Sequence, residues 1–540
     1  MKDISSTGSF INFYLNNYIY VDKTQYIRDL IKLERVFISR PRRFGKSLTL
    51  DTIATLFETG VEPYFKGTWI YDKWTEPTYP VFRLSFLNLD NFSIDEFKSE
   101  LNSKITDFAN KISVKGYVEK SEPENSIEGL LERLREEKRQ IVFLIDEYDY
   151  QLTSNINNDD LYKQFQHKIK RFYANIKNKW AIKFLGITGV TRLKDVEIFS
   201  IGSDIRDITN ASAYSQMIGF TRDEIKKYYI DYLTLAASYE NNCSVDKVTD
   251  AQIESMLDMM AQNYDGYCFD EFYKKKVFST WSVNSFFQCI IENKFVYFDE
   301  YWYDNGGLPS ILVNYLKTHE LNIFEYLDKD KFLKVSSDDF KNPTALTTIN
   351  QNVLMCQTGY LTLRSDLNKT STVALGIPNG EIYKALNRLL ANNIFKGNTD
   401  ITDDYGRSLL EVGTVDDIIN LFNSALNSVS YDNYPIVSES SVQNMLKLYL
   451  LGAHQEVLSE VHEAKGRADL VVNTDNKRIV FEFKYAKNET EAKSKLSEAV
   501  EQIKSRDYGN ILPKKNELLR IAAVFNADPK VRAFTEYQEV

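Results

Sequence analysis

Three residues near the C-terminal end of the chain have the types and spacing for metal-assisted hydrolysis. Asp469 lies in the run GRADLVV, and Glu482 and Lys484 lie in RIVFEFKYAK, which follows the polar segment TDNK. Because side chains alternate across a strand, Glu482 and Lys484 share one face, and Asp469 on a neighbouring strand can reach it. Two carboxylates suit Mg²⁺ or Mn²⁺, and a nearby lysine can orient a water. The pattern indicates phosphodiester hydrolysis, although solvated charges on an amphipathic hairpin would look the same.

A second group of residues, in SRPRRFGKSLTL, has the features of a phosphate-binding loop. Gly45, Lys46 and Ser47 follow the apolar run RVFI and precede a helical pattern. A loop that ends in GKS at a helix N-terminus directs backbone N–H groups at phosphate, with Lys46 on the β- and γ-phosphates and Ser47 on Mg²⁺. Arg40 stands where the general motif has its first glycine, so GKS alone is a weak signal.

Two later strands add the remaining parts of a nucleotide site. The run IVFLIDEYDY ends in Asp146, which would hold Mg²⁺, and Glu147, which would polarise the attacking water. The run IKFLGITGV ends near Thr188, a suitable position for a polar sensor of the γ-phosphate. Each segment alone is common in proteins, but their order along the chain predicts binding of ATP with Mg²⁺ and favours its hydrolysis.

Three arginines are candidates for further contacts to phosphate. Arg42 and Arg43 could donate charge-assisted hydrogen bonds to phosphate oxygens, or could form a solvated basic rim. Arg192, just after the sensor strand, is a candidate arginine finger, and the sequence leaves open whether the protein forms a homo-oligomer.

These segments resemble the AAA-ATPase-like proteins that carry a C-terminal PD-(D/E)XK nuclease domain. The resemblance rests on YVDKTQYI, RPRRFGKS, DEYD, GFTRDEI, YDGY, QTGYLTL and IPNGEIY, and on SEVHEAKGRADLVV, FEFKYAK and EAVEQIKSRDY. It implies that Glu460 joins Asp469 and Glu482 as a metal ligand, with Lys484 orienting the water. It also implies that Gln502 and Tyr508 support the site from a helix.

Hydrophobic periodicity divides the chain into three regions and indicates an α/β protein. Residues 1–231 alternate strands and helices, as expected for the parallel sheet of a P-loop NTPase domain. Residues 232–430 are mostly helical with one short hairpin, which favours a helical lid and a winged-helix-like unit that packs against its neighbours rather than on DNA. Residues 431–540 are expected to form a restriction-endonuclease-like α/β domain, as the resemblance implies.

Composition limits the class of protein but not the substrate. The chain has 540 residues, 43% of them hydrophobic, and a formal net charge of −10. Such acidity argues against a nucleic-acid partner, but residues 431–540 contain 16 Lys and Arg against 17 Asp and Glu, so most of it lies upstream. No apolar run is long enough to span a membrane, and no signal peptide is evident, which favours the cytoplasm.

The sequence therefore predicts an ATP-binding, nucleotide-regulated, metal-dependent nuclease that acts on DNA or RNA. The alternative is a nucleotide-dependent switch or binding module whose nuclease-like domain binds nucleic acid or protein without cutting. An intact Asp469, Glu482 and Lys484 favour the nuclease.

Overall fold

The computed structural model describes most of the chain as two compact units. The residues outside the description are 178, 194–203, 303–309, 318, 320–321, 344, 396–406, 454, 464–465 and 511–513, together with the side chains of Ser310, Arg407, Glu460, His462 and Glu463. The first unit is Met1–Leu321 with Asp330–Ile382, and the second is Asn322–Lys329 with Tyr383–Val540. The predicted three-part division of the chain remains a prediction.

A five-stranded parallel sheet forms the base of the first unit. Its strand order is β2-β3-β4-β1-β5, and its strands are β1 (Arg35–Ser39), β2 (Val81–Ser85), β3 (Ile141–Asp146), β4 (Ile182–Gly189) and β5 (Arg206–Asp207). All five positions of β1 and the first five of β3 are buried, as expected for strands covered on both faces. The carboxyl ends of β1, β3 and β4 therefore meet at one edge of the sheet, where the predicted nucleotide residues lie.

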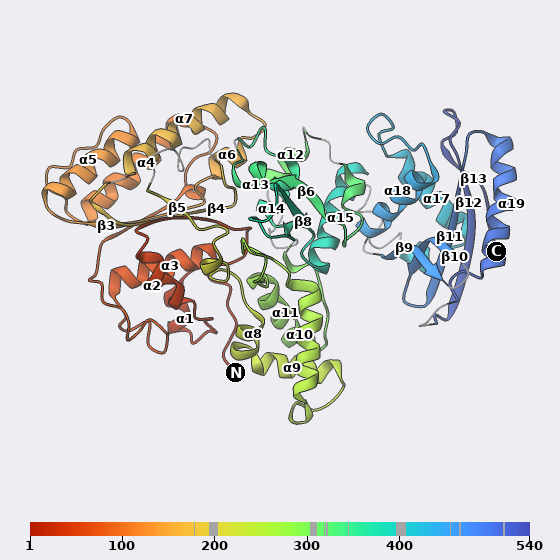
Figure 1. The fold of residues 1–540 in the computed structure, drawn as a ribbon, viewed down its shortest axis with the longest axis horizontal. Helices are drawn as coiled ribbons and strands as arrows, with labels where there is room; N and C mark the ends of the chain where they lie inside the picture. Colours follow the sequence, from red (N-terminus) through yellow and green to blue (C-terminus); the bar gives the residue numbers. More distant parts are fainter. Residues whose placement is uncertain are drawn as a thin grey trace. The chain divides into compact units, whose positions relative to one another are not determined.

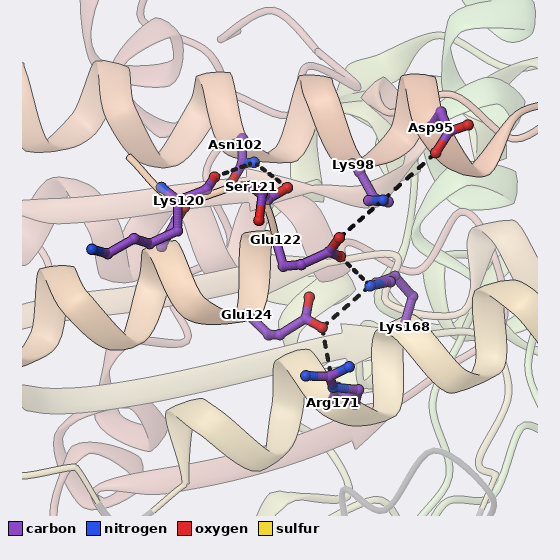
Figure 2. A network of polar contacts seen from close by, with 10 residues as sticks. Asp95, Lys98, Asn102, Lys120, Ser121, Glu122, Glu124, Lys168 and Arg171 are labelled. Carbon is purple, nitrogen blue, oxygen red and sulfur yellow. Dashed lines mark hydrogen bonds and ion pairs between the residues drawn. The ribbon is translucent and has the colours of Figure 1, made fainter. Parts of the chain in front are cut away.

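Helices cover both faces of this sheet. One face carries α1 (Phe10–Leu15), α2 (Thr24–Ile31) and α3 (Lys46–Thr59), and the other carries α4 (Ile94–Lys111), α5 (Pro123–Glu136) and α7 (Asp159–Ile176), with the short α6 (Tyr150–Ser154) after β3 (Figure 1). Ion pairs join the second group, because Lys168 of α7 contacts Glu122 and Glu124 at the start of α5 (Figure 2). Glu122 also contacts Lys98 of α4 at 3.1 Å, so one network connects three helices.

Two smaller substructures complete the first unit. A helical lid contains α8 (Arg222–Tyr228), α9 (Ile230–Glu240), α10 (Asp250–Tyr264) and α11 (Thr280–Asn293), whose apolar faces share one core. A winged-helix-like unit contains α12 (Ser310–Leu316), β6 (Leu333–Ser336), α13 (Ser337–Lys341), α14 (Gln351–Thr358), β7 (Thr362–Leu363) and β8 (Thr372–Gly376). Its antiparallel sheet has the order β6-β8-β7, and β7 and β8 form the predicted hairpin.

The second unit is built on a mixed five-stranded sheet of order β13-β12-β11-β10-β9. The strands are β9 (Glu456–Glu463), β10 (Gly466–Asn473), β11 (Lys477–Ala486), β12 (Glu517–Asn526) and β13 (Ala533–Glu539). The helices are α15 (Gly380–Ile394), which starts in the first unit, α16 (Arg407–Val412), α17 (Val415–Asn427), α18 (Glu439–Gly452) and α19 (Glu489–Arg506). Only β11 and β12 pair in parallel, with α19 as their connection.

The predicted fold class is confirmed. A parallel α/β sheet, a largely helical middle and a C-terminal mixed α/β sheet follow one another along the chain. None of the helices in the described part is long and apolar enough to cross a membrane.

Candidate functional sites

The loop before α3 has the backbone shape of a phosphate-binding loop. Gly45 is the N-cap of α3 with φ of 100°, a left-handed conformation that glycine adopts without strain. Arg43 is also left-handed, with φ of 68°. Lys46 is buried, and its Nζ donates to the carbonyl oxygens of Arg40 at 3.0 Å and Pro41 at 2.8 Å. Burial lowers the pKa of Lys46, and an anion beside the ammonium would reverse that effect.

Asp146 connects the phosphate loop to the neighbouring strand β4. Ser47 Oγ donates to Asp146 Oδ2 at 2.5 Å, and Thr188 Oγ1 donates to Asp146 Oδ1. The acid, the loop serine and the sensor threonine, which were predicted from three separate segments, therefore meet at one carboxylate. The Asp146 carboxylate and the Ser47 hydroxyl are oxygen donors of the kind that would hold Mg²⁺.

Glu147 and Asp149 follow Asp146 but have different surroundings. Glu147 lines the cavity described below and has φ of 52°. Burial, with the charge of Asp146 as a second cause, raises its pKa, which suits a group that exchanges a proton with water. Asp149 is buried and accepts from the backbone N–H groups of Val190 at 3.2 Å and Thr191 at 2.6 Å. Asp149, which the sequence did not single out, thus fixes the end of the sensor strand.

The arginines of the loop have three different environments. Arg40 is buried below the loop, where it donates to the carbonyls of Ser39 and Thr209 and stacks over Phe269, so it turns away from the phosphate position. Arg43 lies over the ring of Trp281 with its Cζ 4.0 Å from the centroid. Arg42 lines the cavity, where its charge remains suitable for phosphate.

A cavity of about 500 Å³ extends from this loop into the first unit. It is lined by the loop itself, by the N-terminal segment before α2 and by residues at the start of α11, including Lys46, Tyr20, Val21, Ile218, Phe220, Trp281 and Asn284. The lining combines the phosphate loop and other polar residues with apolar side chains such as Val21, Ile218 and Phe220. A mixed lining of this kind fits a nucleotide, which joins a charged triphosphate to a flat base.

Lys23 is a cavity residue that the sequence pattern did not reveal. Its Nζ donates to Glu224 Oε2 of α8 at 2.6 Å and to the carbonyl of Gln216 at 2.7 Å. Because Lys23 and Glu224 are about 200 positions apart, no local pattern could have paired them. Their ion pair joins the sheet domain to the lid at the wall of the cavity.

Arg192 lies apart from this cavity. Its Nε forms an ion pair with Asp207, and its backbone N–H donates to Gln357 Oε1 of α14 at 3.2 Å. Arg192 lines a separate small cavity together with Arg40. The structure therefore does not bring Arg192 together with Asp146 and Lys46, and its role as an arginine finger remains a prediction.

In the second unit, strand register brings Asp469, Glu482 and Lys484 to one place. Residues Thr474–Asn476 form the turn between β10 and β11, and Leu470 pairs with Phe481, so that the next position along each strand places Asp469 across from Glu482. Asp469 Oδ2 accepts the backbone N–H of Phe483 at 2.8 Å, and this bond fixes the carboxylate beside β11.

Glu482 is the most unusual group at this site. Its side chain is buried, and Oε1 accepts from Lys484 Nζ at 2.8 Å, whereas no described residue donates to Oε2. Burial and the charge of Asp469 raise the pKa of Glu482 to about 7. Burial alone would lower the pKa of Lys484, but the hydrogen bond and the charge of Glu482 raise it, so the lysine is a cation. A buried carboxylate oxygen without a donor fits a divalent metal ligand.

The third metal ligand implied by the resemblance cannot be placed. The backbone of Glu460 lies on β9 between Ser459 and Val461, which pair with Leu470 and Ala468, but its side chain is outside the description. Among the described side chains, no three His, Cys, Asp or Glu residues converge as a metal site. Two carboxylates, Asp469 and Glu482, still fit Mg²⁺, which retains several waters.

Glu439 is an acid of this site that the sequence analysis missed. It is the first residue of α18, and its Oε1 lies 3.5 Å from Lys484 Nζ. Gln443, one turn further along α18, donates to the backbone carbonyl of Asp469. A negative residue followed by the amphipathic pattern SVQNMLKLYLLGA was the available signal, but only the packing of α18 on the sheet shows where it points.

Gln502 and Tyr508, the predicted supporting residues, contact each other. Gln502 Nε2 lies 3.5 Å from the hydroxyl of Tyr508, and Arg506 Nη1 donates to the same hydroxyl at 2.7 Å. Tyr508 is fully buried and packs with Ala468 and Val480 in the core between α19 and the sheet.

Fold and site together define a chain that joins a P-loop nucleotide-binding fold to a nuclease-like mixed sheet. Comparison with family models identifies the two parts: residues 5–199 match the predicted AAA-ATPase family, and residues 437–534 match the PD-(D/E)XK nuclease superfamily. The chain therefore carries a predicted AAA-ATPase domain and a PD-(D/E)XK nuclease superfamily domain, as the resemblance implied.

A relative matches along nearly the whole chain. The chain is 25% identical over 530 residues to an uncharacterized protein in the vnfD 5′ region of Azotobacter chroococcum mcd 1, and the match covers 95% of this chain and 94% of the relative. Among solved structures, Cdc6p from Pyrobaculum aerophilum matches with 11% identity and a TM-score of 0.21, over 68% of this chain and 92% of that chain.

Proposed function

We propose that this protein is a divalent-metal-dependent nuclease that hydrolyses phosphodiester bonds of DNA or RNA under the control of ATP. The observation that carries the proposal is the buried Glu482, bonded to Lys484 through one oxygen and beside Asp469, with its other oxygen lacking a donor among the described residues. A structural ion pair would be expected to satisfy both oxygens.

Asp469 and Glu482, with Glu460 as the third candidate, would hold Mg²⁺ or Mn²⁺. The metal would supply Lewis-acid stabilisation of negative charge on the phosphate and a more acidic water. Lys484 is held by Glu482 and Glu439 at the same site, so its ammonium can orient a water for attack on phosphorus. Tyr508, which is buried and packs with Ala468 next to Asp469, would support the site together with Gln502.

In the N-terminal domain, we propose that Gly45, Lys46 and Ser47 bind the phosphates of ATP with Mg²⁺. Asp146 would hold the ion, Glu147 would act on the attacking water, and Thr188 would sense the γ-phosphate through Asp146. Three features support this proposal: the buried Lys46, the Ser47–Asp146–Thr188 contacts and the adjoining cavity. Arg42 would add charge at the phosphate end.

The nuclease is tested by cleavage of supercoiled plasmid, linear duplex and RNA with Mg²⁺ or Mn²⁺. Glu482→Ala is expected to reduce the cleavage rate by more than about 100-fold, because loss of a ligand costs at least as much as loss of its supporting groups. Glu498→Ala, which removes an exposed acid of α19, is the matched control and should cut normally. Metal-dependent cleavage that persists in Glu482→Ala would reject this site.

If the native chain binds nucleic acid but cuts none of the three substrates, the result supports the alternative function, a nucleotide-dependent switch or binding module. In that case the C-terminal domain is a binding module and nucleotide controls binding rather than cutting.

A further inference from the structure

Arg506 lies near Asp469 and Glu482, the proposed metal ligands. None of the roles predicted from the sequence involves this arginine. It is the last residue of α19 and is only partly buried. Its Nη1 donates at 2.7 Å to the hydroxyl of Tyr508, which packs against Ala468, the neighbour of Asp469 on β10. This hydrogen bond raises the pKa of Arg506, and the charges of Glu482 and Asp469 raise it further.

Gly466 explains how the arginine reaches this position. A Cβ on Gly466 would lie 2.6 Å from Arg506 Cδ, 3.2 Å from its Nε and 3.0 Å from the hydroxyl of Tyr508. Any side chain at the start of β10 would therefore displace Arg506. The glycine of GRADLVV therefore leaves the space that the side chain of Arg506 occupies.

Tyr508 fixes the guanidinium from the other side. Its buried hydroxyl accepts from Arg506 Nη1 at 2.7 Å and from Gln502 Nε2 at 3.5 Å. A guanidinium has five N–H donors, of which this contact uses one. A fixed, partly exposed cation with further donors is well suited to bind an oxyanion.

A further cation at this site would favour the binding of a negatively charged phosphate. Asp469, Glu482 and Glu439 repel the phosphate backbone, and a metal bound by acids offsets only part of that charge. Lys484 already contacts Glu482 and Glu439.

We propose that Arg506 binds a backbone phosphate of the nucleic acid next to the bond that is cut, and that Gly466 and Tyr508 hold it in place. This inference rests on the proposed nuclease function and adds the substrate contact that the acids cannot make. Arg506 is thus a substrate-binding residue, and Gln502 and Tyr508 act through it as positioning residues.

The test measures binding without cutting, by fluorescence anisotropy of a labelled DNA duplex and a labelled RNA strand in EDTA. Arg506→Gln should weaken binding about tenfold or more, as expected for a lost hydrogen bond between charged groups. It should also reduce the slope of log K against log salt by about one, since one phosphate contact is lost. Arg506→Lys should restore part of the affinity.

Two further variants separate this role from a general charge effect. Lys493→Gln removes an exposed cation of the same helix and should change affinity less than about twofold. Gly466→Ala keeps the arginine but displaces it, so it should weaken binding nearly as much as Arg506→Gln. Gly466→Ala should then have no further effect in the Arg506→Gln background, because both act on one contact.

The outcomes are distinguishable. If Arg506→Gln binds nucleic acid with the native affinity and salt slope and still cuts it, this inference is wrong but the proposed function stands. Independent, additive effects of the Gly466 and Arg506 substitutions would overturn it too. A native chain that neither binds nor cuts nucleic acid would overturn both the inference and the proposed function. If Arg506→Gln fails to fold, as judged by its melting temperature, Gly466→Ala decides the question.

Discussion

Lys46 is a buried cation whose partners are backbone carbonyls of its own loop. Its Nζ donates to the oxygens of Arg40 and Pro41, and burial lowers its pKa. The triphosphate of ATP offers far stronger acceptors to the same ammonium.

We predict that Lys46→Ala weakens ATP binding by more than about 100-fold, as expected when a charge-assisted contact to phosphate is lost. Isothermal titration with ATP and Mg²⁺ measures the change. Lys66→Ala, which removes an exposed lysine of the same domain, is the control and should bind normally. Unchanged affinity in Lys46→Ala would mean that the ATPase fold serves only as a scaffold.

Glu381 is a second buried ionisable residue, and it supports a prediction about pH. Its carboxylate accepts from Ser282 Oγ at 2.7 Å and from the backbone N–H of Trp302 at 2.8 Å, and burial raises its pKa to about 8. Because the folded pKa is above the unfolded one, Glu381 costs stability progressively as the pH rises from about 4.5 through 8.

We therefore expect Glu381→Gln to resemble the native chain in stability near pH 5 and to exceed it by about 1 kcal/mol or more at pH 9, since one pKa unit corresponds to about 1.4 kcal/mol. Melting curves across this pH range provide the measurement. Parallel curves for the two proteins would show that Glu381 does not titrate in this range.

Sequence alone predicted residues that lie within short motifs at the ends of strands and helices. Asp146, Ser47 and Thr188 were found because each ends or begins a regular element, and parallel strands bring such ends to one edge. Glu439, Lys23 and Arg506 were not found, because their contacts depend on packing between elements far apart in sequence. Glu460 was assigned by resemblance, and its side chain lies outside the described part.

At the scale of elements, one ion-pair network joins α4, α5 and α7 (Figure 2). Glu124 is fully buried at the start of α5, where Oε1 contacts Lys168 at 3.2 Å and Arg171 at 3.1 Å. Lys168 is itself mostly buried, whereas the side chain of Arg171 is 50% exposed. The two cations should therefore contribute unequally.

We predict that Lys168→Ala destabilises the first unit by about 3–5 kcal/mol, because it leaves buried Glu124 poorly compensated. Arg171→Ala should cost less than about 1 kcal/mol, since an exposed ion pair is screened by water. Urea unfolding and calorimetry measure the free energy of unfolding of the two variants for comparison. Equal costs would indicate that burial does not control the strength of this network.

The winged-helix-like unit is held against the phosphate loop. Five residues of α14 are buried, namely Asn352, Val353, Leu354, Met355 and Thr358. After α14, Gly359 has φ of 98°, and a Cβ there would lie 2.8 Å from Pro41 of the loop. Trp302 Nε1 donates to the carbonyl of Arg42 at 3.2 Å. This arrangement agrees with the expectation that the unit packs against its neighbours.

Gly359→Ala is predicted to weaken ATP binding as well as stability, because the added methyl group pushes on Pro41. Gly60→Ala is the matched control: Gly60 also has a left-handed φ, of 72°, but a Cβ there would meet nothing within 4 Å. Both variants should lose about 1 kcal/mol from backbone strain, and only Gly359→Ala should lose ATP affinity. Equal ATP affinity in the two variants would contradict contact through Pro41.

At the scale of the whole molecule, one chain carries two chemically separate candidate sites. We predict that the rate of plasmid cleavage by the native chain differs between no nucleotide, ATP and a non-hydrolysable analogue. In Lys46→Ala the three rates should coincide, because the phosphate loop no longer distinguishes the states. Free Mg²⁺ must be held constant, since ATP binds the ion. Identical rates in the native chain would show that the sites act independently.

The alternation of strands and helices in the N-terminal region follows from patterns visible in the sequence, but the path of the chain between the two units does not. The segment Asn322–Lys329 belongs to the second unit, whereas Asp330–Ile382 belongs to the first. The hydroxyl of Tyr383 donates to the carbonyl of Leu327 at 2.9 Å within the second unit. No periodicity in an eight-residue segment indicates such membership.

This crossing path has a consequence for how such chains can be cut and recombined. A gene fragment that starts at Tyr383 encodes every strand of the C-terminal sheet but omits the eight residues that the unit takes from upstream. A fragment that ends at Ile382 keeps those eight residues but lacks the rest of the second unit, with which they are grouped. The second unit is therefore not a segment that a single breakpoint can separate whole from the rest of the chain.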